Sequence, residues 1–200
     1  MSEPLNIPAE IEIKLKVNDF TSVRAALVSA GAHSLGTVRE LNVFFDRPDQ
    51  SLLAQGAGLR LRWFWQKPAA EPQALLTWKG PGLSNILHHR PSLDISVAPP
   101  DQMATLLEVL GFQRTLAFEK IRESWRLDQS RIELDQLPSL GNFVEIEGPA
   151  DAVVLQLQRR LNLMAYPSEH CTYIALVERH LHDHPAQDNT LRFNCLSPEP

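Results

Sequence analysis

Residues 10–17 read Glu-Ile-Glu-Ile-Lys-Leu-Lys-Val and alternate strictly between charged and aliphatic side chains. Successive side chains of a β-strand point to opposite faces, so Glu10, Glu12, Lys14 and Lys16 share one face and the aliphatic residues share the other. The stretch therefore predicts a strand with one fully charged face. Which face of such strands points inward decides the fold.

Seven further strand-like stretches follow, and few helices separate them. The strands are expected at residues 41–46, 58–65, 74–81, 93–97, 115–127, 131–136 and 142–148. Asp19 and Thr21 can cap a helix that Gly31 ends. Further helices are expected at residues 101–110, 151–163 and 169–181. We expect one mainly β domain with helices (α+β) over residues 1–184, and a flexible tail over 185–200 that has little to bury.

The charged strand faces carry blocks of like charge, such as Arg60 with Arg62 and Glu145 with Glu147, and every Trp falls on an opposite face. Like charges two residues apart are unfavourable unless opposite charge lies between them. Two architectures are compatible with the alternation. One is an open sandwich whose charged faces meet water, the usual arrangement of alternating strands. The other, which the blocks favour, is an eight-stranded antiparallel closed barrel with a charged interior and helices packed outside.

A charged barrel interior requires partners, because burying an unpaired charge is costly. Arginine and lysine side chains can hold phosphate oxygens, and carboxylates are the hard ligands that Mg²⁺ or Mn²⁺ takes. The aligned basic residues are Lys14, Arg60, Arg62, Lys79, Arg90 and Arg122. The aligned acidic residues are Glu10, Glu12, Asp135, Glu145 and Glu147. Together they predict a site for a metal–polyphosphate complex.

Charge and composition exclude several other classes. The net charge of 19 − 24 = −5 argues against a general nucleic-acid-binding surface, which needs a basic surplus. No apolar run approaches the roughly 20 residues that span a bilayer, and no secretory signal is visible. Cys171 and Cys195 are interpreted as reduced thiols of a cytoplasmic protein. We expect no nucleic-acid or membrane partner, and a monomer or homodimer.

Other candidate residues are given structural interpretations. His180, His182 and His184 could include zinc ligands, but they lack a supporting ligand cluster and suit a solvated helix end. Cys171 has no context of a nucleophile and is interpreted as a small buried residue.

An ordered set of motifs covers about residues 8–178. The motifs are EIEIK at 10–14, FFD ending at Asp46, LRLR with Arg60 and Arg62, TWKGP with Lys79, then Arg90, FEKIR with Lys120 and Arg122, IELDQLPSLGNFVEIEG with Asp135, Glu145 and Glu147, and HCTYIAL near Tyr173. In this order they resemble the CYTH family, which contains class IV adenylyl cyclases, thiamine triphosphatases and related triphosphate tunnel metalloenzymes.

The resemblance implies an eight-stranded tunnel that holds a triphosphate, namely ATP, thiamine triphosphate or inorganic triphosphate, together with Mg²⁺ or Mn²⁺. By resemblance, the metal ligands would be Glu10, Glu12, Asp135, Glu145 and Glu147. The phosphate-binding residues would be Lys14, Arg60, Arg62, Lys79, Arg90, Lys120 and Arg122. Catalytic roles would fall to Glu10, Glu12, Lys14 and Glu145.

Within the family, EIEIK followed by FEKIR is similar to the class IV adenylyl cyclase branch, which converts ATP to cyclic AMP and pyrophosphate. One departure concerns the strand after Arg90, where the family usually has Arg-x-Glu-x-Glu and this chain has Ser92 and Asp94. Serine cannot replace a carboxylate ligand. Hydrolysis of the terminal phosphate by a triphosphatase, and binding without turnover, therefore stay open as alternatives.

Overall fold

The computed structural model describes residues 7–65, 73–82 and 87–193. Its strands are β1 (Ala9–Val17), β2 (His33–Asp46), β3 (Gly58–Trp65), β4 (Gln73–Lys79), β5 (His88–Val97), β6 (Gln113–Leu127), β7 (Ser130–Leu137), β8 (Gly141–Glu147) and β9 (Thr190–Leu191). Its helices are α1 (Thr21–Ser29), α2 (Ser51–Ala54), α3 (Pro100–Val109), α4 (Asp151–Arg160) and α5 (Tyr173–Asp183). Within these ranges, no helix has both the length and the apolar character needed to cross a membrane.

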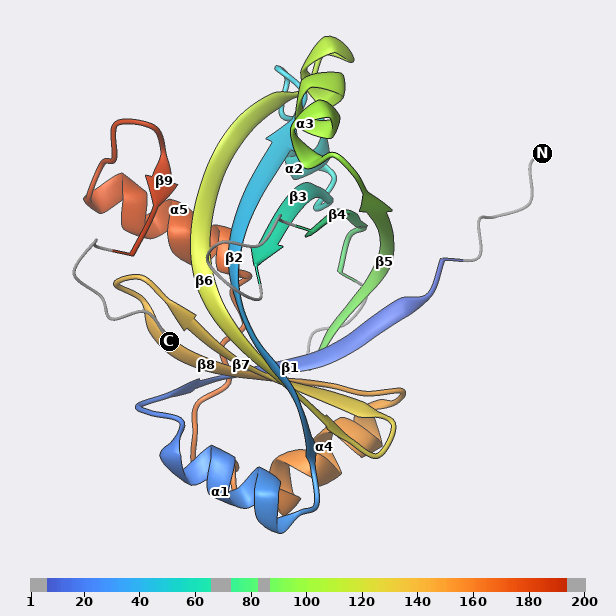
Figure 1. Cartoon of the computed structure of the whole chain (residues 1–200), viewed down its shortest axis with the longest axis vertical. Coiled ribbons are helices and arrows are strands. Elements are labelled where there is room, and N and C mark those ends of the chain that lie inside the picture. Colours follow the sequence, from blue (N-terminus) through green and yellow to red (C-terminus); the bar gives the residue numbers. More distant parts are fainter. Residues whose placement is uncertain (1–6, 66–72, 83–86, 194–200) are drawn as a thin grey trace.

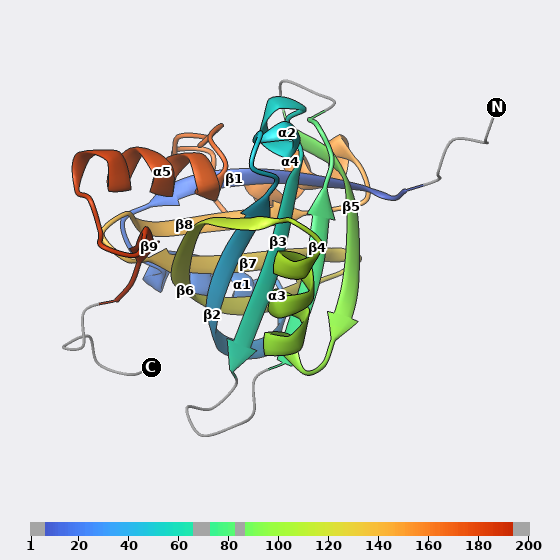
Figure 2. The ribbon, with the colours of Figure 1, turned by 90° about the horizontal axis from the view of Figure 1, so that it is seen from above.

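The first eight strands close into an antiparallel barrel (Figures 1 and 2). Their order is β2-β3-β4-β5-β1-β8-β7-β6, and β2 also pairs with β6, which closes the ring. Closure pairs strand edges that an open sheet would expose. This confirms the expected eight-stranded antiparallel barrel and excludes the open sandwich.

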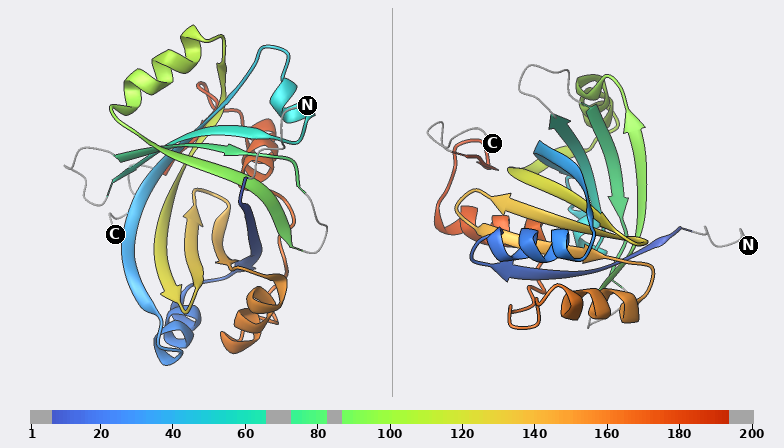
Figure 3. Two further views of the ribbon diagram at one scale, coloured as in Figure 1. Left: turned by 90° about the vertical axis from the view of Figure 1, so that its right-hand side faces the viewer. Right: turned by 60° about the horizontal axis from the view of Figure 1, so that its bottom comes forward.

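The apolar strand faces point outward, where helices cover them (Figure 3). Leu27 of α1 and Leu157 of α4 belong to one buried cluster with the outer faces of β1, β7 and β8. Leu107 of α3 packs in a second cluster with Trp63 and its neighbours on β2 to β4. Val177 of α5 lies in a third cluster that includes Phe118 and Phe143, which share their strand faces with Lys120 and Glu145, so α5 covers one end of the interior instead of an outer face. The charged faces are thereby left to the barrel interior.

Some helix ends follow the signals in the sequence. The Oδ1 atom of Asp19 accepts a hydrogen bond from the Thr21 N–H at 2.7 Å as α1 begins, and Gly31 follows that helix with φ +78°. The Thr172 hydroxyl caps α5 by accepting a hydrogen bond from the Ala175 N–H at 3.3 Å. Side-chain acceptors at these positions satisfy amide groups that have no partner within the helix.

The structure also differs from the expected elements in several places. β5 begins at His88 instead of residue 93. β2 begins at His33 instead of residue 41, because a register shift at Gly36 interrupts the alternation there. α2 lies in a stretch expected to be a loop, and α5 begins at Tyr173 instead of residue 169. β9 pairs in parallel with β6, and Leu191 is 7% exposed. Residues 190 and 191 of the expected flexible tail therefore pack on the barrel.

Candidate active site

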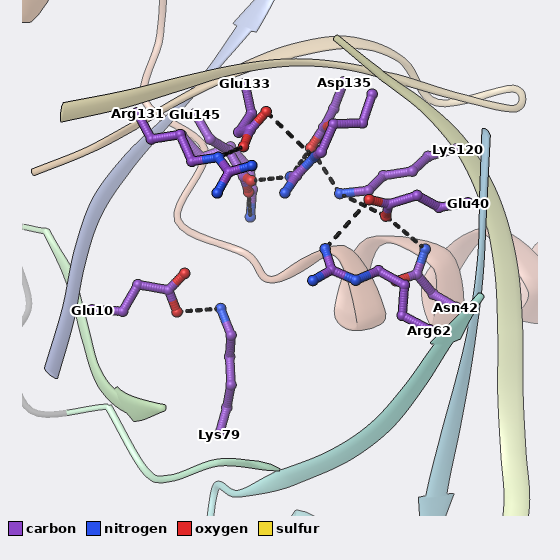
Figure 4. Close-up of polar contacts among 12 residues, drawn as sticks. Glu10, Glu40, Asn42, Arg62, Lys79, Lys120, Arg131, Glu133, Asp135 and Glu145 are labelled. Atoms are coloured by element: carbon purple, nitrogen blue, oxygen red, sulfur yellow. Dashed lines mark hydrogen bonds and ion pairs between the residues drawn. The ribbon is translucent and has the colours of Figure 1, made fainter. Parts of the chain in front are cut away.

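The register of the strands brings the aligned charges together inside the barrel. Lys14 of β1 lies directly opposite Glu145 of β8, and Arg122 of β6 lies opposite Asp135 of β7. Directly opposed residues of antiparallel strands present their side chains on the same face. Figure 4 shows the charged side chains reaching from the surrounding strands into the ring.

Asp135 is the centre of the most extensive ion-pair network. It is fully buried and accepts hydrogen bonds from Lys120 Nζ at 3.0 Å and Arg122 Nε at 2.6 Å. Arg122 also contacts Glu145 Oε2 at 2.6 Å, and Lys14 Nζ lies 3.5 Å from Glu145 Oε1. Burial opposes ionisation of Asp135, but Arg122 and Lys120 outweigh it and hold the pKa of this carboxyl well below its usual value.

Glu40 of β2 joins this network and was not among the residues expected from the sequence. It is 2% exposed, and its carboxylate lies 3.3 Å from Arg62 Nη1 and 3.5 Å from Lys120 Nζ. Burial raises the pKa of Glu40, but Lys120 and Arg62 more than reverse this and lower it to about 2. The strand expected at 41–46 began one residue too late to include it.

Glu10 and Lys79 form a separate contact between β1 and β4. The Lys79 Nζ atom lies 2.5 Å from Glu10 Oε2 (Figure 4). Arg90 of β5 lies opposite Glu10 in the register, and Ser92 lies opposite Lys79. Serine thus stands beside a lysine at the position where the family pattern has a carboxylate.

Glu12 is an interior carboxylate that forms no ion pair among the described residues. Burial raises its pKa to about 7, and the nearby Glu145 adds to this shift. Glu147, which lies opposite Glu12 in the register, also has a raised pKa, caused by burial and by Glu10. Several carboxylates therefore crowd one region where added positive charge would be favourable.

Arg60 lies on β3, where its surroundings also disfavour charge. Burial and the neighbouring Arg62 lower the pKa of Arg60 to about 10. Its Nη2 atom donates to the Thr77 hydroxyl at 3.4 Å, and Thr77 donates to Asp94 Oδ1 at 2.5 Å. Asp94 therefore accepts a hydrogen bond from a threonine on β4, and it forms no ion pair among the described residues.

Two more interior residues are not among the site residues expected from the sequence. Glu133 is 4% exposed and lies 2.5 Å from Arg131 Nε and 4.0 Å from Arg122 Nε. Glu133 shares the charged face of the expected strand at 131–136 with Asp135 but is not among the expected site residues. Tyr173 was noted only as part of a motif, although its ring lies beside Lys14.

The carboxylates match the oxygen chemistry of a divalent-metal site. No three His, Cys, Asp or Glu side chains converge into a metal-binding group in the described part of the chain. The crowding of Glu12 with Glu145 nevertheless suits a divalent cation, because such a cation would relieve the repulsion that raises the pKa of Glu12.

The histidines at the end of α5 do not form a ligand cluster. The rings of His180 and His184 stack with centroids 4.6 Å apart, and His184 Nδ1 lies 3.3 Å from the backbone oxygen of His180. Cys171 is half-buried, and its backbone carbonyl accepts a hydrogen bond from Lys14 Nζ at 3.2 Å. Cys171 thus contacts the site through its main chain and not through its thiol. Cys195 lies outside the described residues.

A closed antiparallel barrel lined by opposed lysines, arginines and carboxylates defines the class of this protein. The CYTH domain model matches residues 8–160, and the chain belongs to the CYTH domain family. The adenylate cyclase CyaB of Aeromonas hydrophila is 27% identical over 184 residues, covering 86% of this chain and 90% of that protein.

Solved structures share the fold. A Pyrococcus horikoshii protein superposes with a TM-score of 0.74 at 22% identity, covering 86% of this chain and 99% of its own. The Hippeastrum protein HpAC1, described as having a dominant triphosphatase activity, superposes with a TM-score of 0.64 at 20% identity and covers 86% of this chain and 96% of its own.

Proposed function

We propose that this chain is a divalent-metal-dependent enzyme that acts on a triphosphate inside the barrel, with conversion of ATP to cyclic AMP and pyrophosphate as the first reaction to test. The observation that carries the proposal is the set of cations and carboxylates that opposed strands present to one closed interior. The relationship to a protein named adenylate cyclase CyaB supports the choice of reaction.

The basic residues would neutralise and orient the phosphates. Arg60 is the first candidate, since its only described hydrogen bond is to an uncharged hydroxyl. Arg122 already contacts Asp135 and Glu145, so a triphosphate must compete with these carboxylates for its donors. Phosphoryl and nucleotidyl transfer depend mainly on positioning and charge neutralisation. Basic residues that clamp the triphosphate would therefore supply much of the catalysis.

Mg²⁺ or Mn²⁺ would be held by Glu10, Glu12, Glu145 and Glu147, with Asp135 beside them. A bound divalent ion would neutralise phosphate charge as the transition state develops. In the cyclase reaction, the ribose 3′-hydroxyl attacks the α-phosphorus and pyrophosphate leaves. Lys14, which lies 3.5 Å from Glu145, would stabilise negative charge that accumulates on the phosphates.

Hydrolysis of the terminal phosphate is the second candidate. Ser92 in place of a carboxylate changes the ligand set of the family, and the related barrel of HpAC1 belongs to a protein described as having a dominant triphosphatase activity. The same clamp would serve this reaction if water, and not a ribose hydroxyl, reached the terminal phosphorus. If the protein binds a triphosphate but forms neither cyclic AMP nor phosphate, it is a binding module without turnover.

The test is an assay with ATP, thiamine triphosphate and inorganic triphosphate in Mg²⁺ or Mn²⁺, with cyclic AMP, pyrophosphate and phosphate measured separately. We expect cyclic AMP with pyrophosphate. Phosphate release without cyclic AMP would reassign the protein as a triphosphatase, and tight binding without product would make it a binding module. Glu10→Gln or Glu12→Gln should abolish turnover, whereas Glu108→Gln on exposed α3 should retain it.

A further inference from the structure

Tyr173 is delivered to the barrel interior from outside. It is the first residue of α5, yet it is 8% exposed and packs edge-on against two aromatic rings of the barrel. Its ring lies 5.4 Å from that of Phe143 at 77° and 6.3 Å from that of Phe118 at 67°. These edge-to-face contacts fix the plane of the tyrosine ring. In Figure 4 a helix lies behind the ring of strands, consistent with α5 closing this part of the interior.

Two lysines of the candidate site approach this one ring. Lys14 Nζ lies 4.1 Å from the ring centroid and Lys120 Nζ lies 5.2 Å from it. Both lysines are almost fully buried, at 2% and 1% exposure. A cation over an aromatic face is attracted by the ring quadrupole, and the attraction is larger when both groups are desolvated.

The ring joins strands that do not touch each other. Lys14 lies on β1 and Lys120 on β6, and β8 and β7 separate these strands in the sheet. The start of α5 also holds Lys14 through the carbonyl of Cys171, at 3.2 Å. The start of α5 therefore contacts two lysines, Lys14 on the strand next to β8 and Lys120 on the strand next to β7.

We propose that Tyr173 is a positioning residue that holds Lys14 and Lys120 against its ring so that both ammonium groups face one phosphate of the bound ligand. The proposal rests on the proposed function, because it assigns the two lysines to phosphate binding. An aliphatic side chain could fill the same volume between the phenylalanines. It could not attract the two ammonium groups, so packing and positioning make different predictions.

The test measures tripolyphosphate binding by calorimetry, without metal, for a series of variants of the full chain. Tyr173→Phe keeps the ring and should bind within about twofold of the wild type. Tyr173→Leu should bind about tenfold more weakly. Phenylalanine analogues with one, two and three ring fluorines at position 173 should weaken binding stepwise, because fluorine withdraws the charge that attracts the cations while nearly preserving shape. This series remains informative if the leucine variant does not fold.

Leu176→Ala is the matched control, because Leu176 lies on α5 in the same apolar cluster. It should lower the melting temperature but leave the tripolyphosphate Kd within about twofold. The ε-methylene protons of Lys14 and Lys120 should be shifted upfield by the ring in the wild type and in Tyr173→Phe, and not in Tyr173→Leu.

The outcomes separate this proposal from the proposed function. If the wild type binds tripolyphosphate but the fluorinated variants at position 173 all have the same Kd, only the role of Tyr173 would be overturned. A wild-type protein that binds tripolyphosphate neither without metal nor in the presence of Mg²⁺ or Mn²⁺ would overturn both, since the lysines would then have no phosphate to meet.

Discussion

The charges on one side of the barrel interior are compensated very differently from those on the other. On β2, β6, β7 and β8, cations and carboxylates meet at ion-pair distances, and the pKa values of Glu40 and Asp135 are lowered. We call Glu40, Lys120, Arg122, Asp135 and Glu145 the paired wall. Here the folded chain itself stabilises the charged form of each carboxyl.

On the opposite side, Glu10 and Lys79 form one ion pair, and we call the remaining residues Glu12, Arg60, Thr77 and Asp94 the open wall. Glu12 has no ion pair among the described residues, and its pKa is raised to about 7. Arg60 meets a hydroxyl and has its pKa lowered to about 10. The two walls share one interior, yet the paired wall supports folding while the open wall is better suited to a ligand that brings its own charge.

The largest effect is expected from breaking the paired wall. Asp135→Asn leaves Lys120 and Arg122 buried with less compensating charge, which should cost about 3–5 kcal/mol of unfolding free energy. Chemical denaturation measures this loss. Asp94→Asn on the open wall is the control and should cost about 1 kcal/mol or less. Equal losses in the two variants would refute the distinction between the walls.

The pH dependence of stability should reveal Glu12. Its pKa is about 7 in the folded protein and about 4.5 in the unfolded chain, so the folded state binds more protons between these values. Stability must therefore fall as pH rises through this window, by about 3 kcal/mol from this group. Glu12→Gln should remove this part of the slope in denaturation curves recorded from pH 4.5 to 8.

Mn²⁺ provides a second check on Glu12. If the metal binds the carboxylates, it should stabilise the wild type above pH 7 and stabilise Glu12→Gln much less. Glu40 contributes with the opposite sign, because its lowered pKa makes its stabilisation disappear only as pH falls from about 4.5 towards 2. A wild-type slope identical to that of Glu12→Gln would contradict the raised pKa.

Removing the cation of the open wall should affect binding more than stability. Arg60→Ala should weaken ATP and tripolyphosphate binding alike, by about 10–100-fold, because one charge-assisted phosphate contact is worth about 1.5–3 kcal/mol. Calorimetry gives both constants. Arg114→Ala, an exposed arginine paired with Glu108 outside the barrel, should change neither. AMP that bound as tightly as ATP would argue against a triphosphate clamp.

The smallest effect is expected from restoring a carboxylate at Ser92. Ser92→Glu would stand opposite Lys79 and should tighten Mn²⁺ binding by less than about fivefold, since a partly exposed ion pair contributes no more than about 1 kcal/mol. Ser92→Gln has a similar length without the charge and is the control. Identical Mn²⁺ affinity in the two variants would place this position outside the metal site.

The sequence was most informative where the relevant pattern is local. Strict alternation from Glu10 to Val17 predicted the charged face of β1, because period-two patterning depends only on the strand itself. Blocks of like charge then predicted a closed barrel, and the register places Lys14 beside Glu145. The ion-pair partner of each charged residue could not be predicted from the sequence, because it depends on which strands become neighbours.

The residues that were missed depend on long-range packing. Glu40 lies near the register irregularity of β2, where alternation gives little guidance to the start of the strand. Tyr173 acts in the interior only because α5 docks against β6 and β8. β9 is two residues long, and its pairing with β6 could not be distinguished from a polar tail. Each of these features is set by tertiary contacts instead of local propensity.

Closure of the barrel has a consequence for synthesis of the chain on the ribosome. In the strand register, Glu40 lies opposite Lys120, which is 120 − 40 = 80 residues later in the sequence. Glu12 lies opposite Glu147, which is 147 − 12 = 135 residues later. Such distant contacts are slow to form, because a long loop must close before the pairing can stabilise it. The nascent chain must therefore carry the unpaired edges of β1 and β2 until β6 and β8 have emerged, and during that interval it depends on protection from aggregation.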